Sequence, residues 1–460
     1  MKKTLILSIL YLSIFSLTKA QNEACQCVQV FEQMTQKIEK NYIAYHLNKS
    51  EIEEAYKTQK SEFHKKSTET TMEQCTALLQ DFLRFFQDKH VFAVAFPKPT
   101  EEELNTTKIL LQNNLIKDVG TVTAKDIEGY WTDGSSKYAI LPNPNENIKF
   151  SHVAIIIEHQ DAAKIGEIKL GVSLNQQQEW VGKYYPNNYA ERYTQIKTYK
   201  EGKLLNIWGG IIWARLDDKN TAIFSPIKPT LKNLNEKTVL IDLPSFLIEK
   251  KDFDDFLKTN ENSIAEASYL IIDLRGNTGG NGIYYNLFSF FAEKSLKSPQ
   301  GLAIASDDNI AYFTKFANLN QANDPHTVVV NNMKTNNGQI VKGPIYPDFM
   351  PKIRKSNIQK VVIWTDKGCM SAAEAFILQA KGLSTKVTTI GNATGGVIDY
   401  NNVNSIPISC ERYGIYFGYP TYSMHENVKT QGYNKTGIIP DIIIETNVDY
   451  TNFTLEFLNK

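Results

Sequence analysis

The sequence predicts an α/β protein in which a helical region precedes the α/β core and a small all-β domain lies between them. Three patterns along the chain support this fold class. Apolar residues recur at steps of three and four near the N-terminus, short apolar runs separated by turns follow, and buried strands then alternate with helices. Alternation of strand and helix is typical of a layered structure with a mostly parallel sheet. The 460 residues are enough for two or three domains.

The overall charge excludes some classes of partner. Lysines and arginines number 50, as do aspartates and glutamates, so the formal net charge is zero. A neutral chain offers no electrostatic reason to bind nucleic acid or an anionic membrane. No apolar run beyond the N-terminus reaches the length of about 18 residues that a membrane span needs, so we expect no span there.

The first 20 residues have the pattern of a secretory signal peptide. Lys2 and Lys3 form a positive start, an apolar run extends from Leu5 to Leu17, and small residues stand where a signal peptidase would cut after Ala20. A retained membrane anchor is the alternative, but the apolar run is short for a span. We therefore expect a mature protein that is secreted or periplasmic.

Export would permit disulfides among the five cysteines, which are Cys25, Cys27, Cys75, Cys369 and Cys410. Pairing of Cys25 or Cys27 with Cys75 would join two N-terminal helices, although sequence alone cannot establish which cysteines pair. The odd number leaves at least one thiol free or in an intermolecular bond.

Residues 21–120 are expected to form the helical region. An apolar stripe predicts a helix over residues 23–48, and a second amphipathic stretch covers residues 78–86. A short strand over residues 91–96 and a helix over residues 101–115 are expected to follow.

Residues 121–228 are expected to form the β-rich domain, barrel-like or sandwich-like. Four of the five tryptophans lie in this segment, where we expect them to serve packing rather than ligand stacking. The strands that we expect here cover residues 138–141, 153–157, 167–172 and 211–216.

Residues 229–460 are expected to form the α/β core. The expected strands cover residues 238–243, 270–274, 361–365 and 387–390. The expected helices cover residues 252–259, 284–292 and 371–381.

Ser371 stands at a strand-to-helix turn in this core. A buried strand over residues 361–365 ends, a turn that contains Gly368 follows, and a helix opens at the serine. Unpaired N–H groups at a helix start favour the anion that develops during acyl transfer. The alternative interpretation is that Ser371 only caps the helix.

A second candidate segment is the glycine-rich loop Asp273-Leu-Arg-Gly-Asn-Thr-Gly279-Gly280, which follows another buried strand. Its backbone N–H groups could form an oxyanion hole or cradle a phosphate, or the loop could be only a tight turn. Neither the dinucleotide pattern nor the phosphate-loop Gly-Lys-Ser/Thr is present, which disfavours the phosphate interpretation.

Together these segments resemble the tail-specific peptidases, which include the C-terminal processing peptidases and the tricorn-like peptidases. The resemblance covers about residues 235–447. It consists of the glycine-rich loop, Ser371-Ala-Ala-Glu374, Gly391-Asn-Ala-Thr-Gly-Gly396 and Gly437-Ile-Ile-Pro-Asp441, in the family's order.

This resemblance implies a crotonase-like, ClpP-like peptidase core and a serine-type endopeptidase that hydrolyses peptide bonds in peptides or proteins. The acyl-enzyme would form on Ser371. The N–H groups of Gly279 and Ala372 would form the oxyanion hole. No cofactor is implied, and the chain lacks the His-Glu-x-x-His and Cys-x-x-Cys patterns of metal sites.

The general base is expected to be His90. The processing branch has a lysine just after the Thr-x-Gly segment, where it acts as general base, but that position here is Val397. The tricorn-like branch uses a histidine from the N-terminal region in a pattern similar to Asp88-Lys89-His90, so the chain is closer to that branch. The other six histidines lack a comparable context.

The residue that orients this base departs from the family pattern. Asn434 occupies the position where the tricorn-like branch has a glutamate, and Asp399 could supply the charge instead. No carboxylate-binding loop of a PDZ domain is found in residues 121–228, so no preference for substrate C-termini is expected. The alternative function is a catalytically weak or inactive family member that binds a ligand or peptide.

Overall fold

The structure is a computed structural model that describes residues 25–207, 211–408, 410–445 and 448–460. The expected signal peptide, residues 1–20, lies outside the described residues. Within the described ranges, the helices are all too short or too polar to cross a bilayer.

The α/β core is built on a twisted sheet with strand order β10-β11-β12-β15-β16-β19 in the described residues. All neighbours pair in parallel except β10 and β11. Its elements are β10 (Thr230–Asn235), β11 (Thr238–Asp242), α5 (Lys250–Thr259), α6 (Glu261–Glu266), β12 (Tyr269–Asp273), η3 (Ile283–Phe290), β15 (Lys360–Thr365), α9 (Ala372–Leu383), β16 (Val387–Gly391), β19 (Ile442–Ile443) and α11 (Tyr450–Leu458).

The central strands are apolar between their end residues, over 270–272 and 361–364, because both faces of the sheet are covered. Leu270 and Ile272 of β12 pack with Phe376 of α9 on one face, and Ile271 packs with Tyr450 of α11 on the other. The predicted α/β class is confirmed. The expected helix over residues 284–292 is instead the 3₁₀-helix η3.

A second sheet carries the N-terminal helices. Its strands are β1 (Phe92–Ala95), β13 (Leu302–Ile304), β14 (Ile340–Lys342), β17 (Tyr400–Pro407) and β18 (Ile415–Ser423). The helices of this part are α1 (Cys27–Asn41), α2 (Ile43–Glu69), α3 (Met72–Leu83), η1 (Arg84–Phe86), α7 (Asp307–Thr314), α8 (Pro325–Thr335) and α10 (Val428–Gln431).

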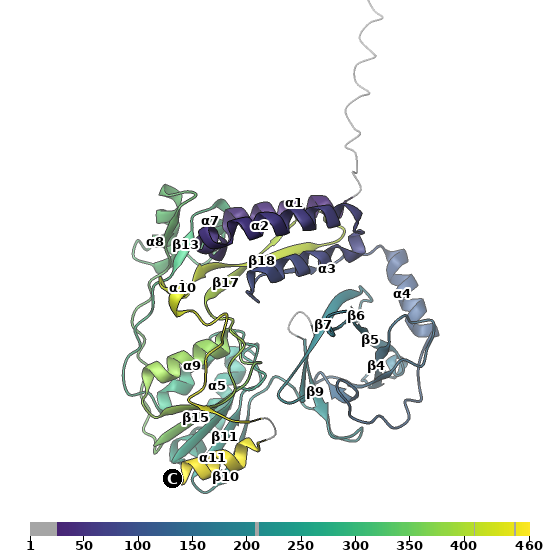
Figure 1. Ribbon diagram of the computed structural model, residues 1–460. Coiled ribbons are helices and arrows are strands. Elements are labelled where there is room, and N and C mark those ends of the chain that lie inside the picture. Colours follow the sequence, from purple (N-terminus) through teal and green to yellow (C-terminus); the bar gives the residue numbers. More distant parts are fainter. Residues whose placement is uncertain (1–24, 208–210, 409, 446–447) are drawn as a thin grey trace, which may run out of the picture.

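The single helix expected over residues 23–48 is wrong, because the chain breaks at Tyr42 between α1 and α2. The N-terminal region is also joined to much later segments. β1 pairs with β18, and the side chains of α1, α2 and α3 share one core with Phe417 and Tyr419 of that strand. Figure 1 shows α1, α2 and α3 lying along β17 and β18, apart from the α/β core.

Between β1 and β10 in the sequence, the chain forms a closed antiparallel barrel that follows the linking helix α4 (Glu101–Asn113). Its elements are β2 (Gly129–Thr132), β3 (Lys137–Pro142), β4 (His152–Glu158), η2 (Ala162–Lys164), β5 (Ile168–Leu174), β6 (Trp180–Tyr184), β7 (Arg192–Tyr199), β8 (Leu204–Ile207) and β9 (Ile211–Leu216). Trp131 and Trp213 are fully buried within it, as expected of packing residues.

Buried charges join the barrel to the core. Lys200, in the turn between β7 and β8, lies 2.7 Å from Asp242 and 3.2 Å from Asp273 at the ends of β11 and β12. Arg275 contacts the same Asp273 at 2.9 Å and Glu201 of the barrel turn at 3.2 Å. Burial opposes ionisation of Asp273, but Lys200 and Arg275 together hold its pKa below its ordinary value.

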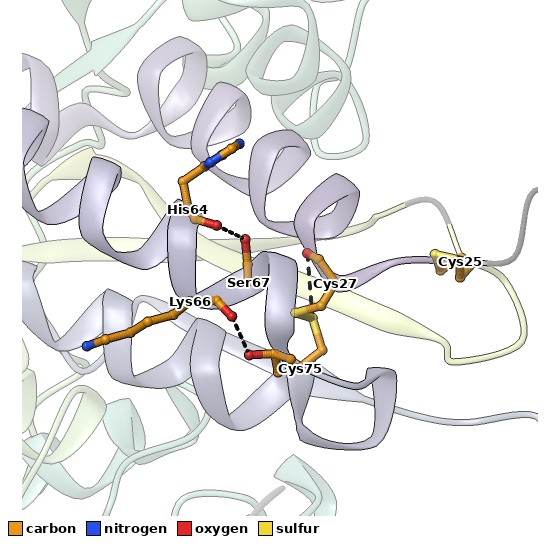
Figure 2. Close-up of a disulfide and its surroundings, with 8 residues drawn as sticks. Cys25, Cys27, His64, Lys66, Ser67 and Cys75 are labelled. Atoms are coloured by element: carbon orange, nitrogen blue, oxygen red, sulfur yellow. Dashed lines mark hydrogen bonds between the residues drawn. A yellow bond between two sulfur atoms is a disulfide. The ribbon is translucent and has the colours of Figure 1, made fainter.

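Two disulfides anchor the N-terminal helices. Cys27 pairs with Cys75, which joins α1 to α3 as one of the two expected pairings, while Cys25 pairs with Cys410 beside β18. Figure 2 shows the first disulfide between the two helices, where the Cys75 sulfur also lies 3.8 Å from the Cys27 carbonyl oxygen. Cys369 is free and buried in the core.

Removal of the Cys27–Cys75 disulfide should destabilise the N-terminal part. The double variant Cys27→Ala, Cys75→Ala opens a loop whose ends are 48 residues apart, and loop-closure entropy predicts a loss of about 4 kcal/mol. Urea unfolding would measure it. Cys369→Ala, which removes a buried sulfur but no disulfide, should cost only about 1 kcal/mol. Similar losses in both proteins would contradict the assigned pairing.

Candidate active site

The candidate site lies where the α/β core meets the second sheet. His90, Gly280, Ser371 and Ala372 line one cavity of about 920 Å³. The rest of its wall is largely aromatic and apolar, with Tyr284, Tyr285, Phe349, Leu378, Tyr422 and Met424 among the lining residues. Sequence positions more than 280 apart therefore share one surface.

Ser371 adopts a strained backbone conformation between β15 and α9. Its φ is 53° and its ψ is −117°, a region that non-glycine residues rarely enter. Such strain costs on the order of 1–3 kcal/mol and is retained where the surrounding structure holds the residue in place. The strain turns Ser371 toward the cavity, an orientation that a simple N-cap, which normally has extended backbone, does not require.

Glu374 holds the start of α9 against the following loop. Its Oε2 accepts hydrogen bonds from the N–H groups of Ser371 at 3.1 Å and Val397 at 2.7 Å. Its Oε1 accepts from the Thr394 hydroxyl at 2.5 Å and the Gly396 N–H at 2.9 Å. Burial raises the pKa of Glu374, and these four donors act against that shift.

His90 follows η1 and faces the serine. Its Nε2 lies 3.1 Å from Ser371 Oγ, and its Nδ1 lies 2.7 Å from the carbonyl oxygen of Tyr400. A carbonyl can only accept a hydrogen bond, so Nδ1 carries the proton and Nε2 is left as the acceptor. This arrangement can take a proton from the serine hydroxyl.

The orienting partner of His90 differs from both residues that the sequence suggested. Asp399 accepts hydrogen bonds from the N–H groups of Tyr433 at 2.5 Å and Asn434 at 2.8 Å, while Asn434 Oδ1 accepts from the Asp399 N–H at 3.1 Å. Asn434 and Asp399 thus bind each other, and the partner of Nδ1 is the Tyr400 carbonyl. No sequence pattern could indicate this, because every residue carries a backbone carbonyl.

The oxyanion-hole assignment also changes at one position. The N–H of Gly279 donates to Asn277 Oδ1 at 2.9 Å, and Gly279 is buried, so this donor is already used. Gly280 is exposed and lines the cavity together with Ala372. Within the described residues no acceptor is found for the N–H of Gly280 or Ala372.

Gly279 instead serves close packing. Its φ is 96°, and a Cβ atom there would lie 2.8 Å from the Met370 carbonyl oxygen and 2.9 Å from the Ala372 nitrogen. Only glycine permits both this conformation and this approach. Its absent side chain therefore allows the glycine-rich loop to approach the serine turn.

Val397, which replaces the lysine of the processing branch, is buried, and its N–H binds Glu374. The neighbouring Lys89 does reach this loop, where its Nζ donates to the Gly395 carbonyl oxygen at 2.5 Å. Among the described residues, no three His, Cys, Asp or Glu side chains gather as a metal site would require.

Comparison with known proteins finds a family match for part of the chain. Residues 237–444 match the profile of peptidase family S41. No curated protein matches the chain. Among solved structures, a serine-to-alanine mutant of CPAF is 11% identical over 94% of this chain and 96% of that one, with a TM-score of 0.51.

Two bacterial structures are similar at lower TM-scores. A lipoprotein from Streptococcus agalactiae is 13% identical over 95% of this chain and 96% of that one, with a TM-score of 0.41. A putative peptidase from Parabacteroides merdae is 12% identical over 94% and 93%, with a TM-score of 0.42. Sequence identities this low indicate a similarity of fold alone.

The serine–imidazole pair has the geometry that nucleophilic catalysis by a serine requires. The similarity to peptidase family S41 thus covers residues 237–444, which make up most of the α/β core. This match supports the resemblance drawn from the motifs, all four of which lie within residues 237–444.

The strain at Ser371 predicts a particular order of stabilities. Ser371→Gly should unfold with a free energy about 1 kcal/mol higher than Ser371→Ala, because glycine enters the region at φ 53° with little strain and its entropic cost is smaller than the strain removed. Urea unfolding of both variants would measure the difference. An alanine variant of equal or greater stability would show that the backbone there is relaxed.

Proposed function

We propose that the protein is an exported serine endopeptidase that hydrolyses peptide bonds through an acyl-enzyme on Ser371, with His90 as general base. The observation that carries this proposal is the 3.1 Å approach of His90 Nε2 to Ser371 Oγ, with Nδ1 bound to a carbonyl oxygen. A base in the correct tautomer within hydrogen-bond reach of a nucleophile is the requirement for this chemistry.

The reaction begins with the substrate carbonyl beside Ser371. His90 accepts the hydroxyl proton as Oγ attacks, and the developing oxyanion accepts hydrogen bonds from the N–H groups of Gly280 and Ala372. His90 then returns the proton to the leaving amine, which leaves an acyl group on Oγ. Water, activated by the same imidazole, hydrolyses the ester and restores the enzyme.

The absence of a lysine base supports assignment to the tricorn-like branch. Val397 occupies the corresponding position, and its buried apolar side chain cannot take up a proton. His90 comes from the N-terminal part of the chain, as in that branch, although the orienting group here is a backbone carbonyl.

The export proposal rests on two features. The N-terminal 20 residues have the charge and apolar pattern of a signal peptide, and two disulfides join Cys25 to Cys410 and Cys27 to Cys75. Disulfides persist in oxidising compartments and are rare in the cytosol. We therefore propose a secreted or periplasmic location.

The serine–histidine unit has a clear kinetic test. Ser371→Ala and His90→Ala should each lower kcat/KM by about a thousandfold or more, and the double variant should be little worse than either single variant, because members of a catalytic unit are not additive. Activity should also fall on acidification, since a protonated imidazole cannot accept the serine proton. Assays with an unstructured protein substrate would measure both effects.

His64→Ala is the matched control, because this histidine is half-buried on α2, contacts Glu32 and Phe31, and does not line the cavity. Its activity should be unchanged. Near-normal turnover by His90→Ala beside an inactive Ser371→Ala would point to another base. An unmutated protein that cleaves nothing and resists serine-reactive phosphonates would favour a binding protein.

Substrate C-termini should not matter to this enzyme. The middle domain is a closed barrel, and the charged side chains that line the cavity are limited to His90 and the exposed Lys297 among the described residues. One exposed cation contributes less than about 1 kcal/mol. Peptides with free and amidated C-termini should therefore be cleaved at rates within about fivefold. A preference of a hundredfold for the free carboxylate would contradict this expectation.

A further inference from the structure

The proposed mechanism creates a positive charge on His90 that its hydrogen-bond partner does not neutralise. The Tyr400 carbonyl holds Nδ1 but carries no charge. Neither residue that the sequence suggested as the orienting group supplies this charge at the ring. Asn434 is neutral, and the Asp399 carboxylate binds two N–H groups of the segment after α10. An imidazolium in a partly enclosed site is costly unless an anion lies near it.

A buried carboxylate does lie beside His90. Asp88 is only 5% exposed, and its Oδ1 accepts a hydrogen bond from the backbone N–H of His90 at 2.9 Å. Its Oδ2 accepts from the Tyr42 hydroxyl at 2.7 Å. Tyr42 is the residue at which the chain breaks between α1 and α2, and it is fully buried.

We propose that Asp88 is the positioning residue of the base: its carboxylate holds the His90 backbone and supplies the negative charge that stabilises the imidazolium. This inference rests on the proposed function. A glutamate at position 434 would both orient His90 and stabilise its positive charge. Here Asp88 supplies the negative charge, and the Tyr400 carbonyl orients the imidazole ring. The two tasks of one side chain are divided between two groups.

The surroundings of Asp88 fit this role. Burial raises the pKa of Asp88 above its ordinary value. The nearby His90 and the two hydrogen bonds act against that shift, so charge on either residue favours charge on the other. Burial also raises the pKa of Tyr42 well above its ordinary value, which keeps its hydroxyl a donor. The other titratable groups around this pair are Lys89 on the same loop, and Asp399 and Tyr400 at the start of β17.

Asp88→Asn is the test, because the amide oxygen can still accept from the His90 N–H while the charge is lost. We expect kcat to fall by about ten- to a hundredfold with little change in KM. The acid limb of the pH profile should move by about one unit to lower pH, since the imidazole then loses an anionic neighbour. A purely structural role would lower activity without moving that limb.

Two variants control for the loss of contacts. Tyr42→Phe removes a hydrogen bond to Asp88 but keeps the negative charge of Asp88. The acid limb of the pH profile should therefore stay where it is in the unmutated protein. Asp399→Asn removes a nearby carboxylate that binds only backbone N–H groups in the described contacts, and should move the limb much less than Asp88→Asn. Equal shifts for both Asp-to-Asn variants would overturn the assignment to Asp88.

A readout without turnover separates this inference from the proposed function. Ring signals of the seven histidines, labelled with ¹³C, can be followed against pH by NMR, with the His90 signal assigned from His90→Gln. The titration midpoint of that signal should move to lower pH in Asp88→Asn whether or not the protein cleaves peptides. An unmoved midpoint would overturn the inference, whereas a moved midpoint in a protein without activity would overturn only the function.

Discussion

One buried carboxylate, that of Glu374, connects the two halves of the site. It lies in the first turn of α9, behind the strained serine, and binds the N–H of Ser371 as well as three donors between Thr394 and Val397. That segment leaves the α/β core and enters β17, whose first residue supplies the carbonyl for His90. The position of the base relative to the nucleophile therefore depends on this one side chain.

The cost of burying Glu374 explains why its contacts are so complete. The side chain is inaccessible to solvent, and a buried charge is tolerated only where hydrogen bonds replace its hydration. Four donors on two oxygens leave little freedom in the serine turn or in the crossing segment. Asp366, which is half-buried, is satisfied in the same way, because its carboxylate accepts hydrogen bonds from the N–H groups of Gly276, Gly368 and Lys200.

Charge burial also determines where the barrel sits. Lys200 reaches from the barrel into the ends of β11 and β12, and Met370, the neighbour of the nucleophile, packs against Tyr199 and Leu204. A displaced barrel would take Lys200 away from Asp242, would leave Asp273 with Arg275 alone, and would expose this apolar contact. The barrel therefore packs against the serine turn and helps to hold it in place.

Local patterns determined the α/β class, the strands β12 and β15, and the glycine-rich and serine motifs of the core, because each depends on residues close together in sequence. The resemblance to the tail-specific peptidases singled out Ser371 and His90 and predicted that they act together, and the two side chains do meet. Only the tertiary structure decided the pairing of β1 with β18, the use of Gly280 in place of Gly279 at the cavity, and the Tyr400 carbonyl at Nδ1. The reason is physical: backbone donors and acceptors are the same at every residue, so their assignment follows from how distant segments pack and not from side-chain identity.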